Sequence, residues 1–243
     1  SYDNEPGAGT WMKSYPVYAD IIADTPGTFE AVMTQIHQGQ VTSWTKLLTY
    51  LQHRPQALAR TIGFELINEP ATYSSAGSLL KNDVLAMTRY VQHCIALVDL
   101  IDTMLPGNGI DIYVGGWRYS AILNILHETY LPHYGKTAFE ALRDRIGLDR
   151  FVWSQHLYPT WIETGCRDMD DLMAGIRARS SIPMDLGVRI AITETNAQND
   201  SANNLDYAVG DHRKAYMLTR HTPFFRKNNI SLFWWPFANW AAG

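Results

Sequence analysis

Two glutamates stand where a pair of carboxylates could act on one substrate. Glu69 follows the apolar run 61–67, and Glu194 follows the apolar run 188–193. Hydrolysis of a glycosidic bond needs one carboxylic acid to protonate the leaving oxygen and a second carboxylate to attack or stabilise the anomeric carbon. Two glutamates that rise from different strands at one edge of a sheet could meet both needs.

Residues that could bind a sugar also follow predicted strands. Asn68 precedes Glu69, and His156 and Tyr158 follow the predicted strand 151–154. The chain has 8 Trp and 13 Tyr, whose flat amphipathic rings suit the faces of sugars. The tryptophans that are candidates for sugar contact are Trp117, Trp161, Trp234 and Trp235. Since Trp234 and Trp235 are adjacent in a predicted strand and must face opposite ways, at most one of them lines the site.

Short apolar runs alternate with helical periods along the chain. The strands expected are 15–22, 61–67, 110–114, 151–154, 188–193 and 230–235. The helices expected are 29–38, 41–53, 80–105, 121–145 with a break near Pro132, 169–178 and 211–227. Interleaved strands and helices, with polar or aromatic residues after the strands, predict an α/β fold made of consecutive units of a (β/α)8 TIM barrel. Functional side chains in that fold lie at the C-terminal ends of the strands.

The motifs taken together resemble those of a known family. They are FELINEP at 64–70, HLYP at 156–159, ITETN at 192–196 and a Trp-rich last strand, in this order. The set resembles the retaining glycoside hydrolases of clan A, most of all the cellulase, mannanase and glucanase group called family 5. The resemblance spans about 41–240. It implies a TIM barrel, an endo-β-glycanase-like activity on a β-linked oligo- or polysaccharide, no cofactor, and a secreted or periplasmic location.

The resemblance also implies a role for each matching residue. Glu69 would be the general acid/base, Glu194 the nucleophile, and Asn68 a hydrogen-bond partner of the sugar 2-hydroxyl. Retention requires the two carboxyl groups to lie about 5–5.5 Å apart. The remaining roles are orientation of Glu194 by Tyr158, lining of the site by His156, a platform beneath the −1 sugar from Trp234 or Trp235, and outer subsites at Trp117 and Trp161.

Most of these residues also have a plain structural interpretation. A glutamate at a strand end is usually a solvated charge or an ion-pair member, which is the commoner case for Glu194 taken alone. A histidine such as His156, taken alone, is more often a hydrogen-bonded core residue, and surface packing explains Trp117 and Trp161 equally well. Cys94, on the long helix 80–105, is expected to be a buried small hydrophobe.

The spacing along the chain departs from that of a whole barrel. With roughly 30 residues a unit, three full units would place an acid/base near position ~95, whereas Glu69 stands earlier. Too few residues follow the last predicted strand for a further helix of ordinary length. We therefore expect residues 1–243 to form one catalytic barrel domain that lacks part of its N-terminal strands and its last helix. The missing strands are expected to come from the rest of a longer polypeptide or from another chain.

Composition and motifs weigh against other classes of protein. With 46% hydrophobic residues, 18% charged residues and a net charge of −4, the chain has material for a core but no basic patch for nucleic acid. No apolar run reaches the ~18 residues that a membrane span needs. The histidines show no HxH or HExxH spacing, and GxSxG, phosphate-loop and GxGxxG motifs are absent, so neither a metal nor a cofactor is expected. The alternative to an enzyme is a non-hydrolysing carbohydrate-binding barrel, either a pseudo-enzyme or a fragment of a larger glycosidase.

Overall fold

The structure is a computed structural model, which describes residues 28–68, 84–116, 120, 123–156, 174, 181–194, 223, 225–227 and 229–233. The chain divides into two compact units. The first comprises residues 1–66, 71–112 and 129–150, and the second comprises residues 67–70, 113–128 and 151–243. The predicted strand 15–22 lies outside the described residues, as do most of the predicted helices 169–178 and 211–227.

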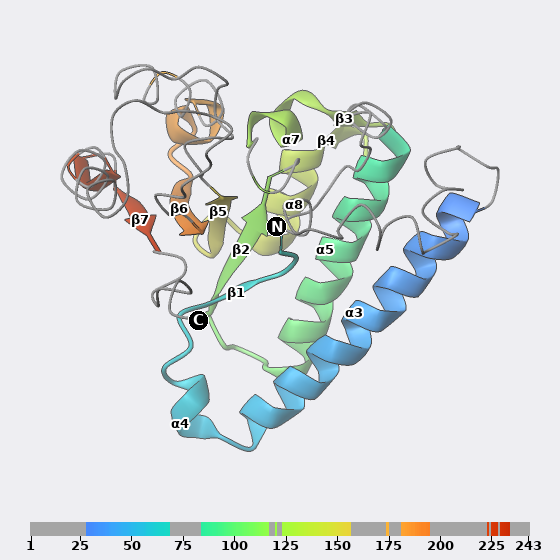
Figure 1. Ribbon diagram of the computed structural model, residues 1–243, viewed down its shortest axis with the longest axis vertical. Helices are drawn as coiled ribbons and strands as arrows, with labels where there is room; N and C mark the ends of the chain where they lie inside the picture. Colours follow the sequence, from blue (N-terminus) through green and yellow to red (C-terminus); the bar gives the residue numbers. More distant parts are fainter. Residues whose placement is uncertain are drawn as a thin grey trace, which may run out of the picture. The chain divides into compact units, whose positions relative to one another are not determined.

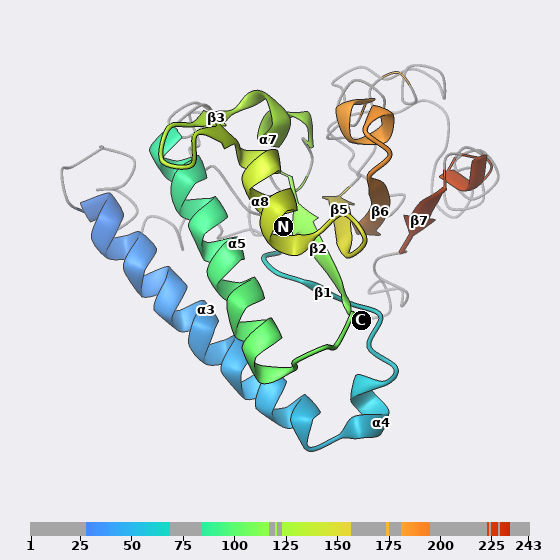
Figure 2. The same ribbon diagram turned by 180° about the vertical axis from the view of Figure 1, so that it is seen from behind.

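Three helices account for most of the described residues of the first unit. They are α3 (Thr28–Gln52), α5 (Val84–Met104) and α8 (Ala138–Ile146), and both α3 and α8 pack against α5 (Figures 1 and 2). The fully buried residues of α5 are Val91, Cys94, Leu97, Val98 and Ile101. They recur every three or four residues, which is the spacing of one helical face. The predicted helix 80–105 is therefore confirmed over 84–104.

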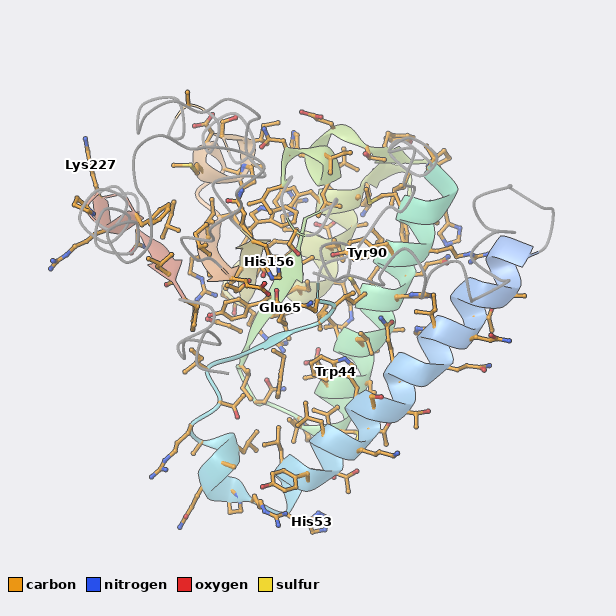
Figure 3. The ribbon with its side chains drawn as sticks, in the orientation of Figure 1. Trp44, His53, Glu65, Tyr90, His156 and Lys227 are labelled. Carbon is orange, nitrogen blue, oxygen red and sulfur yellow. The ribbon has the colours of Figure 1, made fainter. Side chains whose placement is uncertain are left out.

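Helix α3 differs from the prediction, which placed two helices at 29–38 and 41–53. The structure has one continuous helix that ends before Pro55, where the short helix α4 (Pro55–Leu58) begins. Gly39 lies inside α3. A glycine lowers helix stability by about 1 kcal/mol but does not block the backbone hydrogen bonds, so the helix can continue through it. Packing supports the helix: the ring of Trp44, labelled in Figure 3, meets Phe64 edge-on with centroids 5.5 Å apart.

Strand β1 (Gly63–Glu65) is shorter than the predicted strand 61–67. Residues Thr61 and Ile62 precede it in a loop, and the side chain of Ile62 is 67% exposed. An apolar residue in that loop extended the apolar run in the sequence without extending the strand.

The predicted helical segment 121–145 contains a hairpin that the sequence analysis missed. Helix α7 (Asn124–Glu128) is followed by β3 (Tyr130–Leu131) and β4 (Lys136–Thr137), which pair antiparallel. The break near Pro132 is confirmed, and Gly135 closes the turn at φ +66°, a backbone conformation that favours glycine. Helix α8 then begins with a capping box in which Glu140 N donates to Thr137 Oγ1 and Thr137 N donates to Glu140 Oε2.

An ion-pair network fixes the point where β2 (Asp111–Gly115) starts. Arg150 donates through Nε to the carbonyl of Ile110 and through Nη1 to Asp102 Oδ1, both at 3.0 Å. Arg145 donates to the other oxygen of Asp102, also at 3.0 Å. The end of α5 and the chain before β2 are thereby joined to the segment that leads into β5 (Phe151–His156).

The strands follow the chain order β1-β2-β5-β6-β7 in one sheet, with β6 at Arg189–Glu194 and β7 at Ile230–Leu232. Strand β6 pairs parallel with β5 and with β7. All six residues of β5 are buried, which is typical of a parallel strand covered on both faces. The strands predicted at 110–114, 151–154, 188–193 and 230–235 are confirmed at their cores. None of the described helices combines the length and apolarity that crossing a bilayer requires.

Cys94 is expected to resist alkylation in the folded chain. Its side chain is fully buried on α5, as the sequence predicted, and burial raises the pKa of its thiol to about 12. Because the thiolate is the reactive form, iodoacetamide at pH 8 should leave the Cys94 peptide unmodified until denaturant is added. Peptide mapping by mass spectrometry checks this, with Cys166 read separately. Rapid native labelling of Cys94 would contradict the burial.

Candidate active site

The register of β5 and β6 brings two titratable side chains together. The strands pair one to one from Val152 opposite Arg189, and at their ends His156 stands opposite Glu194. Because the carboxyl ends of parallel strands meet at one edge of a sheet, two residues that are far apart in the sequence become neighbours there. Glu194 is the last residue of β6, which confirms its predicted place at a strand end.

His156 and Glu194 form the centre of this candidate site. His156 Nδ1 lies 3.5 Å from Glu194 Oε2. The histidine side chain is 1% exposed and the glutamate side chain 16% exposed, so the carboxylate alone retains some access to solvent. Figure 3 labels His156 among the side chains of the strands. A buried imidazole beside a partly exposed carboxylate can restrict the direction in which that carboxylate points.

A β-bulge lies at this point of the strand pair. The register runs evenly to Gln155 opposite Ile192 and then shifts, so that Thr193 is the extra residue on β6. Successive side chains of a regular strand point to opposite faces, and one extra residue reverses that alternation. The shift therefore turns Glu194 towards the face of β5 that carries His156.

A partly buried hydroxyl pair lies at the bulge itself. Ser154 Oγ and Thr193 Oγ1 are 2.5 Å apart, a short hydrogen bond in which either hydroxyl can donate. Ser154 is fully buried, and it is two residues from His156, so the two side chains share a face of β5. The bulged residue Thr193 is thus bonded to the same strand that carries the histidine.

The sequence analysis did not single out Ser154, Gln155 or Thr193. It ended the strand at Ser154 and placed His156 beyond it, whereas β5 runs to His156. The available signal was the polar run Ser154–Gln155–His156 at the end of an otherwise apolar strand. Buried polar side chains in such a position need hydrogen-bond partners, so the run predicts contacts with neighbouring segments.

The other predicted site residues are described only in part. Asn68 is exposed and follows β1; it belongs to the same compact unit as His156 and Glu194. The residues Glu69, Tyr158, Trp117, Trp161, Trp234 and Trp235 lie outside the described residues. The approach of Glu69 to Glu194 therefore stays a prediction. Within the described ranges, no three His, Cys, Asp or Glu side chains gather in a way that could hold a metal ion.

Comparison with solved structures identifies the fold. A β-glucanase from Saccharophagus degradans is 15% identical and superposes with a TM-score of 0.57 over 85% of this chain and 53% of its own. A glycoside hydrolase family 5 enzyme from Prevotella bryantii B14 is 13% identical, with a TM-score of 0.58 over 85% of this chain and 57% of its own. The endo-β-1,4-glucanase from Xanthomonas axonopodis pv. citri is 14% identical, with a TM-score of 0.53 over 84% and 57%.

These likenesses define the class of fold. The chain has the fold of the clan A glycoside hydrolases of family 5, as part of a (β/α)8 barrel. It spans about half the length of the solved structures that it matches. No protein-family profile and no curated protein matches the sequence.

Proposed function

We propose that this chain carries the active site of a retaining glycoside hydrolase that cleaves β-linked glucans. The observation that carries the proposal is the place of Glu194. It ends a parallel strand of a barrel fold, its carboxylate is partly exposed, and buried His156 contacts it. The C-terminal ends of barrel strands are where enzymes with this fold hold their catalytic residues.

The reaction would proceed by double displacement. Glu69 donates its proton to the glycosidic oxygen as the bond from that oxygen to the anomeric carbon breaks, and the Glu194 carboxylate attacks the same carbon. The product is a glycosyl ester on Glu194. Glu69, now ionised, then takes a proton from water while the water oxygen displaces Glu194 from the anomeric carbon. Two inversions give net retention.

The remaining residues would bind and orient the sugar. Asn68, exposed after β1, is suited to accept from and donate to the sugar hydroxyls. Tyr158 and the four tryptophans 117, 161, 234 and 235 would supply the orienting hydroxyl and the ring platforms. His156, being buried, would act on the glutamate rather than on the solvent-exposed parts of the glycan.

The choice of glucan as substrate follows from the structural neighbours. The Saccharophagus degradans β-glucanase has been solved in complex with cellotetraose, and a second neighbour, with a TM-score of 0.50, in complex with cellopentaose. Because polymeric glucans do not cross membranes, we place the protein outside the cytoplasm, secreted or periplasmic.

The stereochemistry of cleavage tests the proposal directly. The 243-residue chain would be screened against cellulose, β-glucan, mannan, xylan and aryl β-glycosides, with proton NMR reading the anomer that appears first. Double displacement predicts the β-anomer first, followed by slow mutarotation to the equilibrium mixture. The α-anomer first would show inversion and contradict the mechanism. Binding of glucan without any cleavage would instead support a carbohydrate-binding barrel.

A further inference from the structure

The Ser154–Thr193 pair stands apart from the residues that would contact the sugar. Ser154 is fully buried, and no role in catalysis or sugar binding was predicted for either residue, although Thr193 belongs to the ITETN motif at 192–196. Ala191, which pairs with Ser154, is also buried, and Thr193 is partly buried. Two hydroxyls in such surroundings lose hydration, and their mutual hydrogen bond offsets that loss.

The geometry places this pair where it controls the bulge. Thr193 is the extra residue on β6, and its hydroxyl is bonded to Ser154 at 2.5 Å. The next residue on β6 is Glu194, and the next residue on the same face of β5 is His156. A bulge in which Thr193 is bonded to β5 has less freedom to slip back to the regular register. In the regular register Thr193, and not Glu194, would stand opposite His156.

We propose that Ser154 and Thr193 are positioning residues that fix the direction of the Glu194 carboxylate by holding the β5–β6 bulge in place. This inference rests on the proposed function of Glu194 as nucleophile. A misplacement of a reacting group by about 1 Å can lower a rate by about 10²-fold. Loss of the Ser154–Thr193 hydrogen bond is therefore expected to slow the chemical step. Binding of the glycan, which uses other side chains, changes little.

Three variants test the pair in the 243-residue chain. Thr193→Val keeps the size and branching of the side chain but removes the hydroxyl, Ser154→Ala removes the partner, and Thr193→Ser retains a hydroxyl. We expect Thr193→Val and Ser154→Ala to lower kcat on a cello-oligosaccharide about 10–100-fold, with KM within about threefold of the parent. Thr193→Ser should stay within about threefold in kcat. Ser231→Ala, at an exposed residue of β7, is the matched control and should leave kcat unchanged.

The double variant separates positioning from stability. Replacing both members of a buried hydrogen bond by apolar groups of similar shape is nearly neutral for stability. Ser154→Ala/Thr193→Val should therefore unfold at a temperature closer to that of the parent than either single variant does, while its kcat remains low. Recovery of kcat together with stability would show that the pair is only structural and overturn the inference, as would parent-like kcat in both single variants.

A covalent probe can identify the nucleophile and measure its reactivity without catalytic turnover. With a fluorinated dinitrophenyl β-cellobioside, the Glu194 carboxylate forms a bond to the anomeric carbon as dinitrophenolate leaves with the bonding electrons. Mass spectrometry should find the label on Glu194 in the parent and a slower labelling rate in Thr193→Val and Ser154→Ala. Equal labelling rates would contradict positioning. A parent that neither turns over substrate nor becomes labelled at Glu194 would refute the proposed function itself.

Discussion

Replacing Glu194 by alanine is expected to lower kcat on a cello-oligosaccharide by about 10⁴-fold or more. The variant lacks the carboxylate that forms the covalent intermediate, and loss of a nucleophile removes most of the rate enhancement that depends on it. Glu128→Ala, an exposed glutamate on α7 in the same compact unit, is the matched control and should retain the parent kcat. Initial rates of release of reducing sugar, with circular dichroism to verify folding, measure both variants.

Azide distinguishes the role of Glu194 from that of Glu69. In Glu194→Ala, azide can enter the vacated space and displace an activated aryl leaving group, which gives the α-glycosyl azide after one inversion. In Glu69→Ala, the covalent intermediate still forms, and azide then displaces Glu194 to give the β-glycosyl azide. Proton NMR identifies each product. The opposite assignment of azides would mean that the two glutamates exchange roles, and no azide product from either variant would contradict both roles.

Acidification is expected to destabilise the packing of α3 on α5 through His93. The rings of His93 and His37 are stacked with centroids 4.4 Å apart, and His93 is 7% exposed. Burial and, to a smaller extent, the neighbouring His37 and Arg89 together lower the pKa of His93 from 6.5 to about 4. The unfolded chain binds a proton below about pH 6.5 that the folded chain binds only near pH 4. The stability that neutral His93 supplies is therefore complete above pH 6.5 and is lost as the pH falls towards 4.

The expected loss of unfolding free energy over that window is about 3 kcal/mol. His93→Phe keeps an aromatic ring against His37 and cannot take up the proton, so its melting temperature should fall less between pH 7 and pH 4 than that of the parent. His53→Gln, at an exposed histidine just beyond the end of α3, should follow the parent curve. Differential scanning calorimetry across pH measures all three. Parallel curves for the parent and His93→Phe would show that this histidine does not cause the acid sensitivity.

The hairpin β3–β4 is an element that periodicity in the sequence could not predict. A helical period through 121–145 with a break at Pro132 was correct for α7 and α8, but two-residue strands are too short to produce an alternating pattern. Similarly, two helices were predicted at 29–38 and 41–53, whereas α3 is one continuous helix that packs against α5. In both places contacts between distant segments decided what local preferences left open.

The sequence by itself determined that the chain alternates strands with helices, that a long helix lies within 80–105, and that Glu194 stands at the end of a strand. Each of these follows from periodicity or from the order of neighbouring residues, which are local properties. The contact of His156 with Glu194, the bulge at Thr193 and the Ser154–Thr193 hydrogen bond were decided only by the tertiary structure. Register between strands depends on the fit of side chains that lie almost forty residues apart, and a shift of one residue moves a side chain to the other face of the sheet.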